Sequence, residues 1–148
     1  MGYDRFALKE KYPWLVSWET KDEQFEVEYG IDSKYDFGLW TDYMPRGWQI
    51  SFAEQMVEDI ALALEKDCIS PQDYKICDVK EKFGGLRWYD NGGKNVNEVV
   101  DFYTSLSELT CCECGKPAEY FSLGWICPYC EDCAKKLGRM GQKFRAIT

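Results

Sequence analysis

Histidine is absent from the 148 residues of this chain. Its absence excludes mixed cysteine–histidine zinc fingers, and it excludes nucleophile pairs and general bases that depend on an imidazole. No apolar run approaches the roughly 20 residues that span a bilayer, and the opening segment MGYDRFALKEKYPW lacks the apolar stretch of a signal peptide. From these absences we expect a cytoplasmic protein with no membrane partner, and enzymes are the least favoured functional class.

Composition indicates a folded protein. Hydrophobic residues make up 45% of the chain and aromatic residues 16%, with six tryptophans. A chain of this length buries one sizeable core, but it is too short for two independent cores joined by a linker. We therefore expect residues 1–107 to form an α+β domain, and residues 108–148 to pack on it as a subdomain.

Charge is unevenly distributed along the chain, whose formal net charge is −8. Residues 1–70 contain 15 acidic and 7 basic side chains, whereas residues 71–148 contain 11 of each. Such asymmetry commonly serves solubility, and it also fits a basic segment that binds phosphates beside an acidic face. The candidate basic tail comprises Lys135, Lys136, Arg139, Lys143 and Arg145.

Six of the eight cysteines fall within 23 residues near the C-terminus. Four of them are spaced C-x2-C-x15-C-x2-C, which is typical of a four-thiolate zinc site. A disulfide framework is the alternative, and the missing signal peptide and the x2 spacings oppose it. Cys68 and Cys77 stand apart, and we expect both to be reduced core residues. The spacing selects Cys111, Cys114, Cys130 and Cys133 as metal ligands.

Local structure guides this choice among the cysteines. Gly115 predicts a tight knuckle whose backbone amides face the sulfurs. Residues 118–129 predict a hairpin, and the following segment EDCAKKLGRM predicts a short helix that carries a ligand in its first turn. Cys112 then points away from the metal, and Cys127 is a packing residue or a reserve ligand. Knuckle, hairpin and helix describe a treble-clef-like site, structural in role because four thiolates leave no open position.

Three segments of the sequence show helical patterns. RFALKEKY predicts a short helix near the N-terminus, stopped by a proline. Ser51 and Glu54 form a capping box, and apolar residues recur at helical spacing after it. A second long helix is expected over residues 95–109. The acidic stretch 16–49, rich in chain breakers, favours short strands or an ordered loop.

Residues 74–90 predict a β-hairpin with a turn at Gly84-Gly85, and strict alternation places Ile76 and Val79 on opposite faces. The hairpin carries VKEKFGGLRWY, in which cations alternate with aromatic rings. Rings can stack on bases and cations can contact phosphates, so the motif is a candidate for binding nucleotides or nucleic acid. The alternative is a structural hairpin with its rings in the core and its cations in solvent. The candidate residues are Lys80, Lys82, Phe83, Arg87, Trp88 and Tyr89.

Together these motifs resemble a family of small uncharacterised proteins from phages, prophages and bacterial genomes. That family is recognised by a KEKFG-x-LR-[FW]-Y core and a C-terminal zinc signature, C-x2-C-G-x-P followed by C-x2-C/H. The resemblance covers roughly residues 43–133 and implies a mobile-element origin and bound zinc, but no established activity. The matching positions are Lys80 to Tyr89, Ser107, Cys111, Cys114, Gly115, Pro117, Gly124, Trp125, Cys130 and Cys133, with Pro45, Arg46, Gly47 and Trp48 upstream.

We expect an α+β fold in which two main helices pack on a small antiparallel sheet, with a treble-clef-like zinc subdomain at the C-terminus. The favoured function is a non-enzymatic interaction protein, encoded by a phage or other mobile element, that binds a host protein or nucleoprotein in the host cytoplasm. By analogy with other small acidic proteins of such origin, we expect a role in counter-defence or regulation. The alternative is a nucleotide or nucleic-acid binding protein that uses the central motif and the basic tail.

Overall fold

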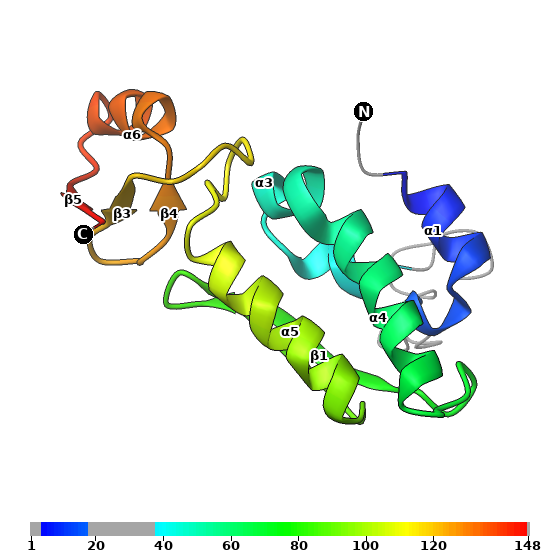
Figure 1. Ribbon diagram of the computed structural model, residues 1–148. Helices are drawn as coiled ribbons and strands as arrows, with labels where there is room; N and C mark the ends of the chain where they lie inside the picture. The colour runs from blue at the N-terminus through cyan, green and yellow to red at the C-terminus, as the bar shows by residue number, and fades with distance from the viewer. Residues whose placement is uncertain (1–3, 18–37, 148) are drawn as a thin grey trace.

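The computed structural model describes residues 4–17 and 38–147 of the chain. Most of the stretch 16–49, for which we expected short strands or an ordered loop, lies outside these residues. Where the stretch is described, Trp40–Tyr43 and Arg46–Trp48 are helical and bury Trp40 and Trp48, so the expectation is wrong there. Figure 1 shows two lobes: α1, α4 and α5 lie in one, and α6 lies in the other with three short strands. We call residues 4–17 and 38–107 the main lobe, and residues 108–147 the cysteine lobe. No helix in the described part is long and apolar enough to cross a membrane.

The main lobe is built from helices and one hairpin. A short helix near the N-terminus is confirmed as α1, and two longer helices, α4 and α5, flank the hairpin β1–β2 in the sequence. Its elements are α1 (Arg5–Lys11), η1 (Pro13–Leu15), η3 (Trp40–Tyr43), α3 (Arg46–Trp48), η4 (Gln49–Ala53), α4 (Glu54–Lys66), β1 (Ile76–Lys82), β2 (Gly85–Asp90) and α5 (Lys94–Ser107).

The helical stretch that leads into α4 begins at Arg46, directly after Pro45. It continues through the π-helical turn η4 into α4, so Ser51 lies inside the helix and no side chain caps the start of α4. The predicted capping box is therefore wrong. The physical reason is that Trp48 is also fully buried, so the apolar stripe starts one turn before Phe52.

Strands β1 and β2 pair antiparallel around a two-residue turn made of Phe83 and Gly84. Both turn residues have positive φ angles, 55° and 84°, as the tightest hairpin turns require. The hairpin is confirmed, but its turn lies one residue earlier than predicted, since Gly85 already pairs with Lys82.

A bulge at Cys77 interrupts the alternation of β1, because the register shifts between Ile76 and Asp78. Ile76 and Val79 are both buried as a result, and the prediction that they lie on opposite faces is wrong. The bulge also leaves Cys77 exposed, so its predicted place in the core is wrong.

Cys68 is exposed as well, against the prediction, because it ends α4 in a left-handed conformation with a φ angle of 56°. The amide of Ile69 donates to the carbonyl of Leu64 and the amide of Cys68 donates to that of Glu65, at 3.0 and 3.1 Å. This is a Schellman motif, and Cys68 occupies the position that glycine usually takes.

Helix α5 packs along β2, and α4 packs beside α5. The α+β fold is thereby confirmed: two main helices lie against a small antiparallel sheet. The core sits between these elements and continues under α1 and η3. Its largest fully buried side chains are Trp40, Trp48, Tyr74, Leu15, Leu39, Met56, Ile60, Leu64, Ile76 and Leu86.

The cysteine lobe follows α5 without a linker. The predicted hairpin and helix are both present, and a third strand, which we did not predict, returns to pair with β3. The strand order is β4-β3-β5. The elements are β3 (Tyr120–Ser122), β4 (Pro128–Tyr129), α6 (Glu131–Gly138) and β5 (Phe144–Ala146).

Candidate metal centre

The first cysteine pair lies in a knuckle directly after α5. The amide of Cys111 donates to the carbonyl of Lys116 at 2.7 Å, and the amide of Gly115 donates to the carbonyl of Cys111 at 3.0 Å. Gly115 has a φ angle of 83°, and a Cβ there would lie 2.7 Å from the carbonyl oxygen of Gly47. Glycine is therefore required at the point where the knuckle closes.

The second pair lies at the start of α6. Cys130 is the N-cap residue of this helix, and its sulfur accepts a hydrogen bond from the amide of Cys133 at 3.5 Å. Cys133 lies in the first turn, where the partial positive charge of the helix end favours a thiolate. A rigid helix start thus fixes both sulfurs.

The structure brings together the four cysteines that the spacing selected. The four sulfurs all lie within 4.8 Å of one another, and those of Cys114 and Cys130 are 3.5 Å apart. Zinc–sulfur bonds of about 2.3 Å in a tetrahedron place the sulfurs about 3.8 Å apart, so the cluster is of the right size. Cys111 is fully buried and Cys114 is half-buried. The cluster could hold a metal ion, and its identity as zinc stays a prediction.

The thiols of this cluster have perturbed acidities. Burial acts to raise the pKa of Cys111, but backbone hydrogen bonds from Cys114, Cys130 and Glu113 outweigh it and lower the pKa. Burial raises the pKa of Cys133, and the neighbouring thiols of the cluster raise it further. The surroundings therefore favour ionisation of Cys111 and oppose that of Cys133, and a bound cation would offset the mutual repulsion of neighbouring thiolates.

Cys112 and Cys127 lie outside this cluster. Both are buried in the core of the main lobe, whereas Cys111, Cys130 and Cys133 form a separate small core. The amide of Cys112 donates to Pro128 at 2.9 Å, and that of Cys127 donates to the Ser122 hydroxyl at 2.9 Å. Their position is that of packing residues that join the two lobes.

Gly47 forms the closest joint between the lobes, and sequence reasoning did not single out its role. Its amide donates to the carbonyl of Cys112 at 2.8 Å, and a Cβ at this position would lie 2.1 Å from the carbonyl oxygen of Cys111. The neighbouring Trp48 donates its indole N–H to Thr110 at 3.0 Å. No local signal indicated this role, because the glycine stood in a stretch rich in chain breakers that was not expected to be helical.

The hairpin motif divides into two faces. Trp88 is buried and donates its indole N–H to the Tyr74 hydroxyl at 3.0 Å, so it belongs to the core. Lys80 pairs with Arg87 across the strands, and directly opposed residues share a face. Alternation places Lys82 and Tyr89 on the same side. The structure therefore gathers four of the six candidates, namely Lys80, Lys82, Arg87 and Tyr89, on an outer face of the hairpin.

Phe83 lies at the hairpin turn, next to the cysteine lobe. A cleft of about 250 Å³ lies between the turn and the β3–β4 loop. The indole N–H of Trp125 donates to the Glu81 carboxylate at 3.0 Å and holds the two sides together. We call this the tip cleft, and its lining residues are Glu81, Lys82, Phe83, Gly124, Trp125 and Ile126.

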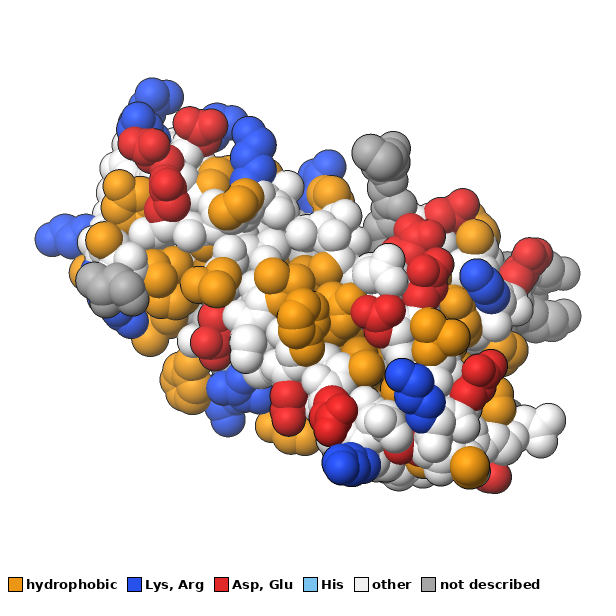
Figure 2. Space-filling model, in the orientation of Figure 1, with side chains coloured by type: hydrophobic (Ala, Val, Ile, Leu, Met, Phe, Trp, Pro, Cys, Tyr) orange, Lys and Arg blue, Asp and Glu red, His pale blue; other side chains and the backbone are white. Residues whose placement is uncertain are grey.

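The residues of the candidate basic tail lie in the folded cysteine lobe, on or next to α6 and β5. Lys135 and Lys136 lie on α6, and Lys135 pairs with Glu131 at 3.3 Å. Arg145 lies on β5 with its guanidinium 5.0 Å from the ring centre of Phe121. Figure 2 shows Lys and Arg side chains around α6, mixed with acidic ones. α6 and β5 therefore spread these cations over the cysteine lobe, and their role in binding phosphates stays a prediction.

No family model matches the chain, and neither a curated protein nor a solved structure is similar to it.

Proposed function

We propose that this chain is a non-enzymatic interaction protein whose four-cysteine centre holds a structural Zn²⁺ ion. Four thiolates complete a tetrahedral coordination shell and leave no position for water or substrate. Bound zinc supplies folding free energy on the order of 10 kcal/mol in modules of this kind. The order of knuckle, hairpin and helix supports the treble-clef-like description.

The proposal rests mainly on the exposure and the backbone conformation of Phe83. This residue is 72% exposed and holds a φ angle of 55°. Asparagine, aspartate and glycine are preferred at that turn position, and an exposed ring there contributes no core packing. A residue that strains the backbone without stabilising the fold is typical of a functional surface.

Trp125 stands on the other side of the tip cleft and is 78% exposed. Its hydrogen bond to Glu81 fixes the indole, so the cleft is formed before a partner arrives. Exposed aromatic rings that flank an apolar cleft are frequent anchors of protein interfaces. We therefore assign the tip cleft as the interaction surface.

Zinc has a direct part in this surface. The hairpin side of the cleft belongs to the main lobe, while Gly124, Trp125 and Ile126 belong to the cysteine lobe. A Cβ at Gly84 would lie 3.3 Å from the Ile126 side chain, so the two sides are closely packed. Loss of the metal would unfold the cysteine lobe and so remove one wall of the cleft. A structural ion would therefore be needed for partner binding.

The partner that we propose is a host protein or nucleoprotein, in line with the resemblance to phage and prophage proteins. A counter-defence or regulatory role in the host cytoplasm is proposed by analogy with other small acidic proteins of such origin. Support from the molecule itself is the largely apolar, aromatic character of the cleft, which suits a protein side chain better than a phosphate beside Glu81.

A nucleotide or nucleic-acid ligand is the second candidate, favoured by the outer face of the hairpin. Lys80, Lys82 and Arg87 lie there beside the ring of Tyr89, and Lys80 is 6.0 Å from that ring's centre. Stacking on a tyrosine with cations nearby is a mode by which single strands are bound. Such binding weakens steeply with salt because each neutralised phosphate releases counterions.

A crosslinking capture experiment in bacterial cells separates these candidates. The test variant is Phe83→Asn/Trp125→Ala, and the matched control is Phe6→Ala/Met140→Ala, which removes two side chains of similar exposure, 72% and 83%. Captured proteins are quantified by mass spectrometry with and without nuclease. We expect the test variant to lose the partner, the control to keep it, and nuclease to leave it in place.

Two outcomes decide against the proposal. Capture of the same proteins at parental yield by the test variant would rule out the tip cleft as the interaction surface. Loss of capture on nuclease treatment, together with loss in Lys80→Gln/Lys82→Gln/Arg87→Gln, would instead support the nucleic-acid candidate. Metal content and melting temperature, measured for each variant, separate loss of binding from loss of folding.

A further inference from the structure

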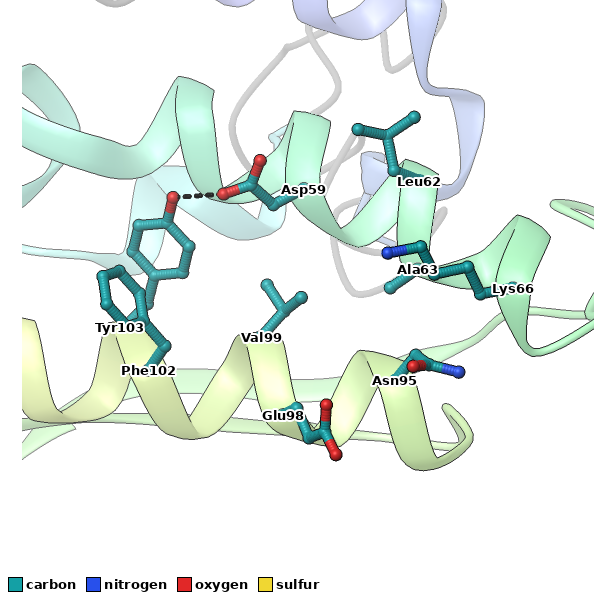
Figure 3. Close-up of a pocket in the computed structure, with 9 residues that line it drawn as sticks. All are labelled: Asp59, Leu62, Ala63, Lys66, Asn95, Glu98, Val99, Phe102 and Tyr103. Carbon is teal, nitrogen blue, oxygen red and sulfur yellow. Dashed lines mark hydrogen bonds between the residues drawn. The ribbon is translucent and has the colours of Figure 1, made fainter.

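A second surface lies in the main lobe, in a groove between α4 and α5 (Figure 3). The groove encloses about 310 Å³. Among its lining residues Ala63 and Tyr103 are buried and Val99 is half-buried, while Leu62 and Phe102 are exposed and form its rims. The small side chain of Ala63 is what leaves the space between the two helices open.

The rims of the groove are apolar and exposed. Leu62 is 58% exposed and Phe102 is 62% exposed, although each belongs to a helix whose other apolar residues face the core. They come from different helices and border one hollow. Large apolar side chains that line one hollow cost solubility and mark interaction surfaces more often than scattered ones do.

Charge around the groove is mainly acidic. Along α4, four acidic residues accompany one lysine, and along α5 two accompany one lysine. Asp59 and Glu98 line the groove itself, where Lys66 is the basic lining residue. Figure 2 shows the hydrophobic side chains in the middle of this face, with acidic side chains and a few basic ones around them.

Hydrogen bonds hold the two helices in place at both ends of the groove. The Tyr103 hydroxyl donates to the Asp59 carboxylate at 2.5 Å. At the other end, Asp67 accepts hydrogen bonds from the amides of Asn95 and Val96 at 2.9 and 3.0 Å and so caps the start of α5. The groove is therefore preorganised, and a ligand would not have to order it.

We propose that this groove binds an amphipathic helix of a partner protein, with apolar side chains on one face and lysine or arginine beside them. Packed helices that leave an apolar groove accept a third helix through side chains spaced three and four residues apart. The acidic surroundings select a basic helix by charge complementarity. They oppose a second copy of this acidic chain. The inference depends on neither the tip cleft nor the metal.

The probe is a synthetic amphipathic peptide of about 18 leucine and lysine residues, with leucines on one helical face. Two matched peptides accompany it: one has the same composition with the leucines scattered, and one has glutamate in place of lysine. Affinity is measured by fluorescence anisotropy. We expect the amphipathic basic peptide to bind, the scattered peptide to bind about tenfold more weakly, and the glutamate peptide not to bind.

Protein variants locate the binding. Leu62→Ser/Phe102→Ser removes both rims and should weaken binding about tenfold, and Glu98→Lys should weaken it by a smaller factor. The Phe83→Asn/Trp125→Ala variant serves as the matched control and should bind as the parent does. Two-dimensional ¹H–¹⁵N NMR spectra of the complex should show chemical-shift changes for residues of α4 and α5. The same spectra of the free variants show whether each variant is folded.

Either of two results would overturn the proposal. One is equal affinity of the folded Leu62→Ser/Phe102→Ser variant and the parent for the amphipathic peptide. The other is equal affinity of the parent for the amphipathic and the scattered peptide, which would mean attraction to the acidic surface without a groove.

Discussion

The main lobe buries Trp40, Trp48 and Tyr74 among many aliphatic side chains, whereas the hydrophobic side chains buried after Thr110 are five cysteines, Pro128 and Ala134. Full burial of one large apolar side chain stabilises a fold by roughly 1.5–3 kcal/mol. The main lobe has such burial in quantity, and the cysteine lobe does not. A unit of this size with so small a core needs another source of stability, which a bound metal ion would provide.

The two lobes are nevertheless joined. Cys112 and Cys127 contribute to the core of the main lobe, and Gly47 places backbone against the knuckle. The main lobe therefore supports the position of the candidate metal centre, while a bound metal ion would support the lobe in which it lies. A substitution in the cysteine lobe should therefore change metal content, whereas one in the core of the main lobe should change the stability of that lobe.

Loss of a metal ligand should have the largest effect. We expect Cys130→Ser to release the metal and unfold the cysteine lobe, since structural zinc contributes on the order of 10 kcal/mol to such modules. The main lobe should stay folded. Native mass spectrometry measures the metal, and nitrogen–proton spectra report each lobe.

Cys112→Ser is the matched control, because this thiol lies outside the cluster and next to a ligand in sequence. It should retain one metal ion per chain. The ligand assignment is wrong if Cys112→Ser loses the metal while Cys111→Ser keeps it.

The opposite pattern is expected for a core residue of the main lobe. Trp88→Ala should lower the free energy of unfolding of the main lobe by about 3–5 kcal/mol, because it leaves a large cavity. Metal content should not change in the folded protein. The neighbouring Tyr89 is exposed, so Tyr89→Ala should change stability by at most about 0.5 kcal/mol. Similar costs for the two variants in a denaturant titration would contradict the assignment of Trp88 to the core.

Gly47→Ala should affect both lobes at once. The added methyl group meets backbone atoms of the knuckle, which cannot move aside as a side chain could. We expect a cost of about 1–3 kcal/mol and faster loss of the metal to a chelator. Gly138→Ala is the control, because a Cβ there meets nothing within 4 Å, and helix propensity favours alanine. Equal rates of metal loss in the two variants would show that Gly47 does not form the joint.

Local signals in the sequence predicted much of this architecture. The x2 cysteine spacing selected the four residues that the structure brings together, and apolar periodicity predicted α5 at nearly its observed bounds. These features depend on residues close in sequence. The start of the first long helix depends on distant residues instead, because the helical stretch begins at Arg46, where Gly47 and Trp48 pack against the knuckle. The capping-box pattern at Ser51 matched the expected sequence and was misleading.

The candidate binding surfaces were harder to predict. Alternation through β1 fails at the bulge at Cys77, and nothing in the residue type of Phe83 indicates a positive φ angle. The tip cleft and the α4–α5 groove are each formed by segments distant in sequence, so they depend on tertiary contacts that no local pattern contains.

The smallest expected effects come from the two non-glycine residues with positive φ angles in the described part of the chain, Cys68 and Phe83. A left-handed conformation costs an ordinary residue roughly 1–2 kcal/mol, and part of this is recovered when the residue is changed to one that favours it. Cys68→Gly and Phe83→Asn should therefore each raise the free energy of unfolding by about 0.5–1 kcal/mol, measured by denaturant titration. The two should differ in function: Cys68→Gly should bind partners as the parent does, whereas Phe83→Asn should gain stability and lose binding at the tip cleft. If Phe83→Asn destabilises the protein, its ring contributes to the fold, and the strained turn is no sign of function.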